Sequence, residues 1–234
     1  MANFNKLKQL LYKNGASLIG FANLKDLNLY GRYNMNYGIS IVVALNPKIV
    51  NEIINGPTKE YQEEYWSVNK LLDKLNSIAA TFLQDKGYNA IAFSATSGKF
   101  NPRYSHTLST NLPHKTVATR AGIGWIGKCA LLITKHFGSA IRLTTVLTNA
   151  PFNYDAPIKD SLCGDCMDCV QICPGKAVSG KNWEIGMFRD EFFNLFKCEK
   201  AKREISLEKG LIQEVCGKCI SVCPWTKNYT ENNC

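Results

Sequence analysis

The stretch Cys163–Pro174 reads CGDCMDCVQICP, and the stretch Cys216–Pro224 reads CGKCISVCP, with Cys198 between them. The first has the spacing C-x2-C-x2-C-x3-C-P, and the second has the spacing C-x2-C-x3-C-P. Three cysteines two residues apart can wrap one corner of a cubane, while the fourth, followed by proline, points away to a neighbouring cluster. The two stretches therefore predict two 4Fe-4S clusters.

The same spacing is found in bacterial two-cluster ferredoxins, in which the last cysteine of each run serves the other cluster. Transferred to this sequence, that arrangement uses eight cysteines without a remainder. The first cluster takes Cys163, Cys166, Cys169 and Cys223, and the second takes Cys173, Cys198, Cys216 and Cys219.

Zinc and disulfides are the competing uses of these cysteines. A structural zinc site needs four ligands and has no use for the C-x2-C-x2-C-x3-C-P run. Disulfides suit short secreted chains, whereas this sequence has 234 residues and shows no signal peptide. Clusters are the better explanation.

Composition limits the partners and the location. The formal charge of +9 falls to roughly +5 when each cluster with its four thiolates adds about −2. A basic face for RNA, an acidic redox partner or a phosphate-bearing cofactor competes with an ordinary lysine-rich surface. The amphipathic N-terminus and the absence of an 18-residue apolar run predict no membrane segment and a cytoplasmic protein.

Periodicity predicts an α+β fold with a mostly antiparallel sheet. The segments ALLIT (130–134) and AIRLTTVLT (140–148) are expected to form a hairpin with its turn at 137–139. We expect a cofactor-binding domain over residues 1–155 and a ferredoxin-like domain over residues 156–234. The other expected elements are a helix near the N-terminus, strands at Ala16–Leu24, Gly38–Pro47 and Tyr88–Thr96, and helices at Glu60–Lys86 and His114–Ala121.

A second group of motifs precedes and surrounds the cysteines. ATRAGIGWIGKCALLI (118–133) comes before the first cysteine run, and VCGKCISVCPWTKN ends the second. Together these motifs resemble the epoxyqueuosine reductase family, which is related to reductive dehalogenases. The resemblance implies a nitroreductase-like α/β sandwich core that binds cobalamin, followed by the two-cluster module. It also implies that the clusters feed electrons to a base-off corrinoid.

The resemblance assigns the glycine-rich segment to the corrin ring. Its members are Arg120, Gly122, Gly124, Trp125, Gly127 and Lys128. Glycines allow a backbone to approach a large planar ligand, a tryptophan offers an apolar face, and the basic side chains can donate to amide or phosphate oxygens. On the residues alone, a tight turn with a core tryptophan is the better explanation of the segment.

The sequence departs from the family pattern at three places. The family aspartate thought to protonate the substrate has no equivalent in the stretch 106–110, so His106 and His114 become candidate general acids, with a surface or capping role as the alternative. Cys129 stands where many relatives have Asn, and is either a small buried apolar residue or a ligand or nucleophile. The sequence ends soon after CPWTKN, so a short member without the C-terminal helical-repeat extension is expected.

These observations favour a cobalamin-dependent iron-sulfur reductase whose substrate the sequence does not identify. Two alternatives stay open: an electron-transfer protein that reduces the corrinoid of a partner, and a flavin-dependent iron-sulfur reductase that binds FMN. The expected electron donor is reduced ferredoxin or flavodoxin. The acceptor is a small molecule, a tRNA or a corrinoid protein.

Overall fold

The computed structural model describes residues 4–27, 35–96 and 112–233. The chain divides into two compact units, each built from several segments. Unit 1 comprises residues 1–43, 68–123 and 142–158, and unit 2 comprises residues 44–67, 124–141 and 159–234. The unit boundary nearest to the predicted division at 155/156 lies between Ile158 and Lys159. The division into two contiguous domains stays a prediction.

Unit 1 is organised around a four-stranded sheet with the order β1-β2-β6-β3. β1 pairs with β2 and β3 pairs with β6, both antiparallel, with Ile19 opposite Ile41 and Ile91 opposite Leu147. These two pairs agree with the predicted antiparallel sheet. The strands are β1 (Leu18–Asn23), β2 (Tyr37–Ala44), β3 (Ala90–Phe93) and β6 (Ile141–Thr148).

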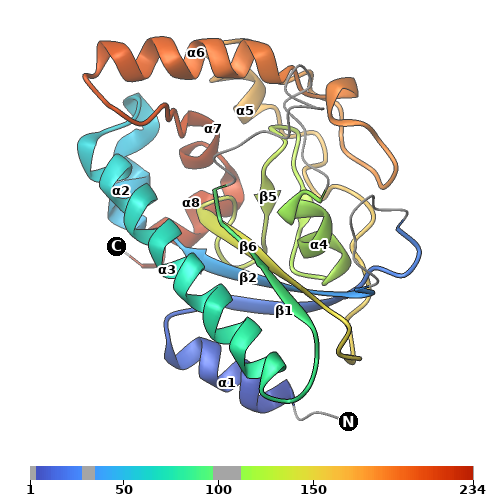
Figure 1. Ribbon diagram of the computed structural model, residues 1–234. Helices are drawn as coiled ribbons and strands as arrows, with labels where there is room; N and C mark the ends of the chain where they lie inside the picture. Colours follow the sequence, from blue (N-terminus) through green and yellow to red (C-terminus); the bar gives the residue numbers. More distant parts are fainter. Residues whose placement is uncertain (1–3, 28–34, 97–111, 234) are drawn as a thin grey trace. The chain divides into compact units, whose positions relative to one another are not determined.

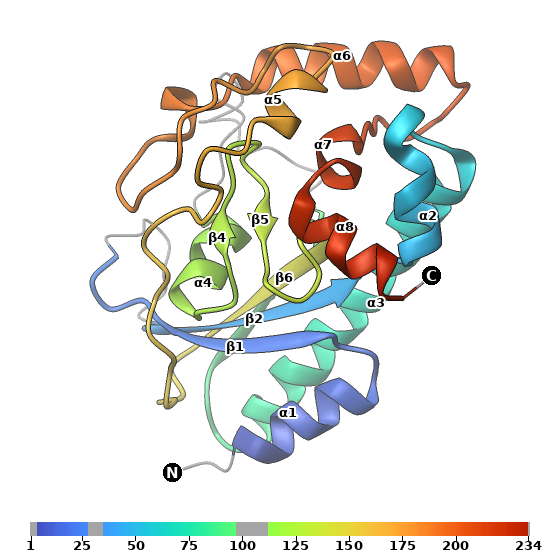
Figure 2. The same ribbon diagram turned by 180° about the vertical axis from the view of Figure 1, so that it is seen from behind.

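Helices cover both faces of this sheet. α1 (Phe4–Lys13) and α3 (Lys59–Gln84) lie on one face, and α4 (His114–Arg120) lies on the other (Figures 1 and 2). α4 approaches the sheet closely, because a side chain at Gly38 would clash with Val117. The mixed α and β composition that the sequence predicts is therefore present.

Unit 2 holds both cysteine runs. Its short helices α5 and α7 lie between α6 and the two-stranded sheet in both views (Figures 1 and 2). The two-stranded sheet pairs Trp125 with Ile133 and Ile126 with Leu132. The elements are α2 (Pro47–Glu52), η1 (Ile53–Asn55), β4 (Trp125–Ile126), β5 (Leu132–Ile133), α5 (Asp168–Gln171), η3 (Arg189–Glu191), α6 (Leu195–Glu208), α7 (Lys218–Ser221) and α8 (Pro224–Glu231).

The predicted hairpin between the segments 130–134 and 140–148 is wrong. β5 pairs with β4, whereas β6 lies in the four-stranded sheet. The turn expected at 137–139 exists, since Thr134 forms an isolated bridge with Gly138, but no further pairing follows it. β5 pairs with the strand that precedes it, β4. The chain turns back between these two strands, where Ala130 has a left-handed backbone with φ 59°.

Sequence reasoning also missed α2. Its signal is the dipeptide Asn46–Pro47: the Asn46 side chain accepts a hydrogen bond from Lys48 N at 3.0 Å, and Pro47 occupies the first helical position. Both are standard features of a helix start. The predicted strand had run through this boundary to Pro47, whereas β2 ends at Ala44.

Candidate metal centre

A cavity of about 130 Å³ lies inside unit 2 and is lined by thiols. It brings together Cys163, Cys166, Cys169 and Cys223, the four cysteines predicted to hold the first cluster. Cys219 and Cys129 line it as well. The remaining lining residues are Lys128, Ile133, Asp168, Pro224 and Trp225. Soft thiolate ligands around an otherwise largely apolar cavity suit an iron-sulfur cluster.

Cys223 reaches the cavity from the start of α8. Burial raises the pKa of the Cys223 thiol, and the backbone N–H groups of Thr226 and Trp225 lower it to a smaller extent. Buried Thr226 is itself fixed, because its Oγ1 accepts a hydrogen bond from Ser139 N at 3.0 Å. The turn before Ser139 comes so close that a side chain at Gly138 would clash with Thr226.

Three of the four cysteines predicted for the second cluster, Cys173, Cys198 and Cys216, approach one another beside α6, whereas Cys219 lines the thiol-lined cavity. Burial raises the pKa of Cys198 to about 11, and the nearby thiols of Cys173 and Cys216 act in the same direction. Gly175 lies so close to the Lys197 carbonyl that any side chain at position 175 would clash with α6. This contact holds the end of the first cysteine run next to Cys198. Thiols with raised pKa values must release protons when they ligate iron.

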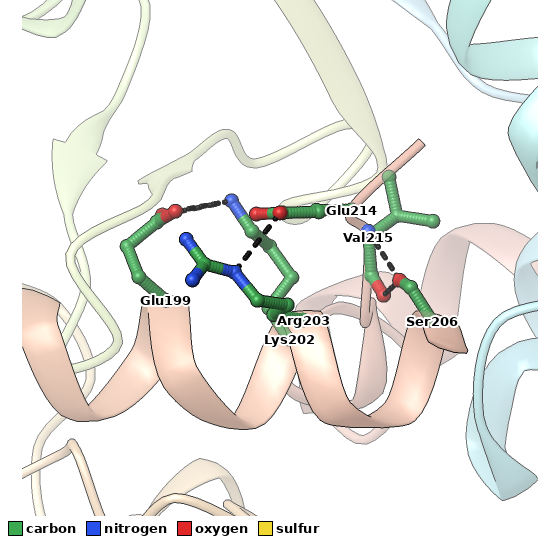
Figure 3. A network of polar contacts seen from close by, with 6 residues as sticks. All are labelled: Glu199, Lys202, Arg203, Ser206, Glu214 and Val215. Atoms are coloured by element: carbon green, nitrogen blue, oxygen red, sulfur yellow. Dashed lines mark hydrogen bonds and ion pairs between the residues drawn. The ribbon is translucent and has the colours of Figure 1, made fainter. Parts of the chain in front are cut away.

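Polar contacts fix the segment that carries Cys216 to α6 (Figure 3). Ser206 Oγ donates to Val215 O and accepts from Val215 N, both at 2.9 Å. Arg203 on α6 forms an ion pair with Glu214 at 3.1 Å, and Lys202 pairs with Glu199 within α6 itself at 2.8 Å. α6 also carries Cys198, so this network sets the separation of two predicted ligands.

A second anchor holds the same segment from the first turns of α3. Gln62 Oε1 accepts hydrogen bonds from Ile212 N and Gln213 N, both at 2.8 Å. Gln62 is buried. Neither Ser206 nor Gln62 carries a motif, so sequence reasoning missed both.

The structure bears on the two competing uses of the cysteines. All nine described cysteines are free thiols, so none of them forms a disulfide. Among residues 4–27, 35–96 and 112–233, no three His, Cys, Asp or Glu side chains gather closely enough to hold a single metal ion. The cysteine sulfurs instead surround a volume larger than one ion. The thiol donor set fits iron-sulfur clusters.

Cys129 is a ninth thiol at this site. It is buried and lines the cavity together with Cys169 and Cys219. The hydrogen bond with Cys169 lowers the pKa of Cys129, but the hydrogen bond with Cys219 and burial raise it, and the net pKa lies well above that of a free thiol. The pKa of Cys169 is also raised, first by its hydrogen bond with Cys129 and then by burial. Cys129 therefore stands between ligands assigned to two different clusters.

Four residues predicted to contact a corrin ring are packed against the protein within unit 2. Side chains at Gly124 or Gly127 would clash with Ile133 of the neighbouring strand. Trp125 is fully buried, and its ring meets Trp225 edge-on with centroids 5.0 Å apart. The glycines therefore allow strand pairing, and the tryptophan is part of the core. Lys128 is buried at the cavity itself.

The other two predicted cofactor residues belong to unit 1. Arg120, at the end of α4, forms an ion pair with Asp26 at 2.8 Å. Gly122 has φ 67°, and a side chain there would press on Ala156 O and on Asp155. The glycine thus meets the need for a left-handed backbone in a crowded turn. A role of these six residues in cofactor binding stays a prediction.

His114 is held in unit 1 by both ring nitrogens. Nδ1 lies 3.0 Å from Thr145 Oγ1, and Nε2 lies 3.1 Å from the carbonyl oxygen of Ser94. Because a carbonyl only accepts, Nε2 carries a proton and donates it. Burial lowers the pKa of His114. The other candidate acid, His106, lies outside the described residues.

Comparison with known proteins agrees with this site. Residues 162–226 match the family described as "4Fe-4S double cluster binding domain". This part of the chain is thus similar to a double-cluster iron-sulfur domain, in agreement with the cysteine arrangement. The curated relatives are epoxyqueuosine reductases: the chain is 33% identical over 134 residues to that of Bacillus anthracis and 42% identical over 116 residues to that of Bacillus subtilis. The resemblance predicted from the sequence is confirmed.

These alignments cover part of each protein. They include 52% and 42% of this chain, but 32% and 30% of the two relatives. The chain thus spans about a third of the length of the curated relatives that it matches.

Solved structures share the fold. The catabolic reductive dehalogenase NpRdhA matches over 99% of this chain and 33% of its own, with a TM-score of 0.76 and 18% identity. An epoxyqueuosine reductase crystallised with an epoxyqueuosine-modified tRNA stem loop matches over 96% of this chain and 65% of its own, with a TM-score of 0.66 and 18% identity. Of the helices in the described part of the chain, none is long and apolar enough to cross a membrane.

Proposed function

We propose that this chain forms the redox core of a cobalamin-dependent iron-sulfur reductase of the epoxyqueuosine reductase type. The observation that carries the proposal is the thiol-lined cavity, which draws its cysteines from both runs. A single cysteine run would not need Cys223 beside Cys163, whereas the crossed two-cluster arrangement requires it. The double-cluster domain and the fold shared with both enzyme classes support it.

The chain's own residues would bind and orient the cofactors. Cys163, Cys166, Cys169 and Cys223 would hold the first cluster, and Cys173, Cys198, Cys216 and Cys219 the second. When bound, the clusters would carry single electrons and the corrinoid would supply a low-valent cobalt centre. Cobalamin is supported by a structural neighbour, described as a reductive dehalogenase that suggests a mechanism for B12-dependent dehalogenation.

Anaerobic titration of the cluster-reconstituted protein with cob(II)alamin tests the proposal. Electron paramagnetic resonance should show a stoichiometric change to a base-off cobalt signal, and FMN added in parallel should not bind. Binding of FMN instead would replace the proposal by a flavin-dependent reductase. Reconstitution that gives no cubane signal would contradict the redox core itself.

A second candidate is an electron-transfer protein that reduces the corrinoid of a partner. The engagement of both His114 nitrogens favours it, because an acid that is already hydrogen bonded must break a bond before it protonates a substrate. The packing of Trp125 and the glycines against the protein points the same way. This candidate predicts that the reduced protein restores the Co(I) state of a separate corrinoid protein without turning over a small substrate.

The proposed partners follow from the same chemistry. Reduced ferredoxin or flavodoxin would supply low-potential electrons in the cytoplasm. The acceptor would be a small molecule, a tRNA or a corrinoid protein. Stopped-flow mixing of the oxidised protein with reduced flavodoxin should bleach the cluster absorbance, and the three acceptors can then be compared by single-turnover reoxidation.

A further inference from the structure

Lys128 is a buried lysine without a carboxylate partner among the residues that the structure describes. Only 3% of the surface of this residue is exposed to solvent. The Nζ atom donates a hydrogen bond to Cys166 O at 2.9 Å and lies 3.6 Å from Met167 Sδ. Both partners are uncharged. An ammonium group is seldom buried unless a negative charge compensates it.

The missing negative charge has a natural source in the cavity that Lys128 lines. The same cavity is lined by Cys163, Cys166, Cys169 and Cys223. With four thiolates, an oxidised 4Fe-4S cluster carries a net charge of about −2. Asp168 also lines the cavity, but it forms no ion pair with Lys128. The charge that would balance Lys128 is therefore that of the cluster.

We propose that Lys128 is the buried counter-charge of the first cluster and sets its reduction potential. This inference rests on the proposed cluster assignment. Reduction adds one electron to a centre that is already negative, and a fixed cation at low dielectric stabilises the more negative state. Lys128 thus raises the potential of the first cluster relative to that of an uncharged residue. Of the four cysteines assigned to the second cluster, Cys219 alone lines this cavity, so we expect a smaller effect of the Lys128 charge on that cluster.

The geometry gives Lys128 a second effect that the test must separate from its charge. Its hydrogen bond to Cys166 O also holds the loop of the first cysteine run. Lys128→Gln removes the charge and keeps a side-chain N–H donor. Lys128→Met removes both and keeps the length of the side chain. Lys181→Gln removes the charge of an exposed lysine in the same unit and serves as the matched control.

The experiment is a dithionite titration of the reconstituted full chain with redox mediators, followed by electron paramagnetic resonance. Cys198→Ser identifies the signal of the second cluster beforehand. Iron content, measured in the wild type and in each lysine variant, shows that both clusters are present. We expect Lys128→Gln and Lys128→Met to lower the ratio of reduced to oxidised first cluster at least tenfold at a fixed potential, equal to 59 mV for one electron.

The outcomes separate the alternatives. A shift of the first cluster alone in both Lys128 variants, with Lys181→Gln unchanged, supports the inference. A shift in Lys128→Met but not in Lys128→Gln would assign the effect to the hydrogen bond and overturn it. Equal shifts of both clusters, or none, would overturn it as well. A wild-type chain that binds no cluster would overturn the proposed function and this inference together.

Discussion

Ser206 and Val215 form a reciprocal pair of hydrogen bonds, in which one buried hydroxyl satisfies both the N–H and the carbonyl of Val215. Val215 directly precedes Cys216, and Ser206 is on the helix that carries Cys198 (Figure 3). The pair therefore connects the backbones on which two predicted ligands of the second cluster lie.

Substitution Ser206→Ala should release this connection. It leaves two backbone groups unpaired at a cost of about 1–3 kcal/mol each if they stay buried. We expect the second cluster to lose iron to a chelator several times faster, while the first cluster keeps its rate. Anaerobic iron release, followed by absorbance and electron paramagnetic resonance, measures both. Ser67→Ala, an exposed serine of unit 2, is the control, and equal acceleration at both clusters would contradict the prediction.

Cys129 should be dispensable for cluster content. Eight other cysteines account for two cubanes, and Cys129 contacts two of them as a neighbour rather than replacing one. Cys129→Ala should therefore retain the iron and sulfide content of the wild type after reconstitution, whereas Cys169→Ala should lose about half. Equal iron loss in the two variants would show that Cys129 is a ligand.

Gly138 should be required for stability, because there is no room for a side chain at this position. A Cβ there meets Thr226, and the residue has φ 54°. Gly210 has a similar φ of 64° but open space around it, so Gly210→Ala carries the backbone strain without the clash. The left-handed strain costs roughly 1–2 kcal/mol in both variants, and overpacking adds about 1–3 kcal/mol in Gly138→Ala alone. Thermal unfolding of the reconstituted variants measures the difference, and equal melting temperatures would contradict the clash.

His114 should make stability depend on pH. Burial is the largest cause that lowers the pKa of this imidazole in the folded state, and the charge of Arg142 lowers it further. The hydrogen bond to the Ser94 carbonyl and the charge of Asp73 act in the opposite direction. The unfolded chain then binds the proton more readily, so the stability that neutral His114 confers is complete above about pH 6.5. It is lost as the pH falls from there through the lower folded pKa.

The measurement is the melting temperature between pH 5 and pH 8. His114→Gln should flatten the fall at acid pH, and His136→Gln, at an exposed histidine, should leave it unchanged. An identical acid fall in wild type and His114→Gln would show that other groups cause it.

Local sequence patterns were enough to predict the features that depend on residues close together in the chain, namely the cysteine runs and helix α3. The four cysteines that the spacing assigned to the first cluster line one cavity, although their role as ligands stays a prediction. The long amphipathic segment identified α3 to within two residues at its C-terminal end. Both patterns repeat over a short stretch of sequence, so recognising them does not require knowledge of contacts between distant segments.

What could not be predicted depends on contacts between distant segments. β5 pairs with β4 and not with β6, although the expected turn at Gly138 is present. Lys128 looks like a ligand-binding lysine in a glycine-rich loop, but its partner, Cys166 O, lies 38 residues further along the chain. Ser206 and Gln62 have ordinary surroundings in the sequence, and only the fold shows what they hold.

The position of Cys223 in the cavity has a consequence for biosynthesis. Cys163 and Cys223 line the same cavity, and the helix that presents Cys223 begins at Pro224. A nascent chain can display the first cysteine run long before its fourth thiol has been translated. With the proposed ligand assignment, complete assembly of the first cluster would have to wait until Cys223 has been translated, 50 residues after Cys173, the last cysteine of the first run.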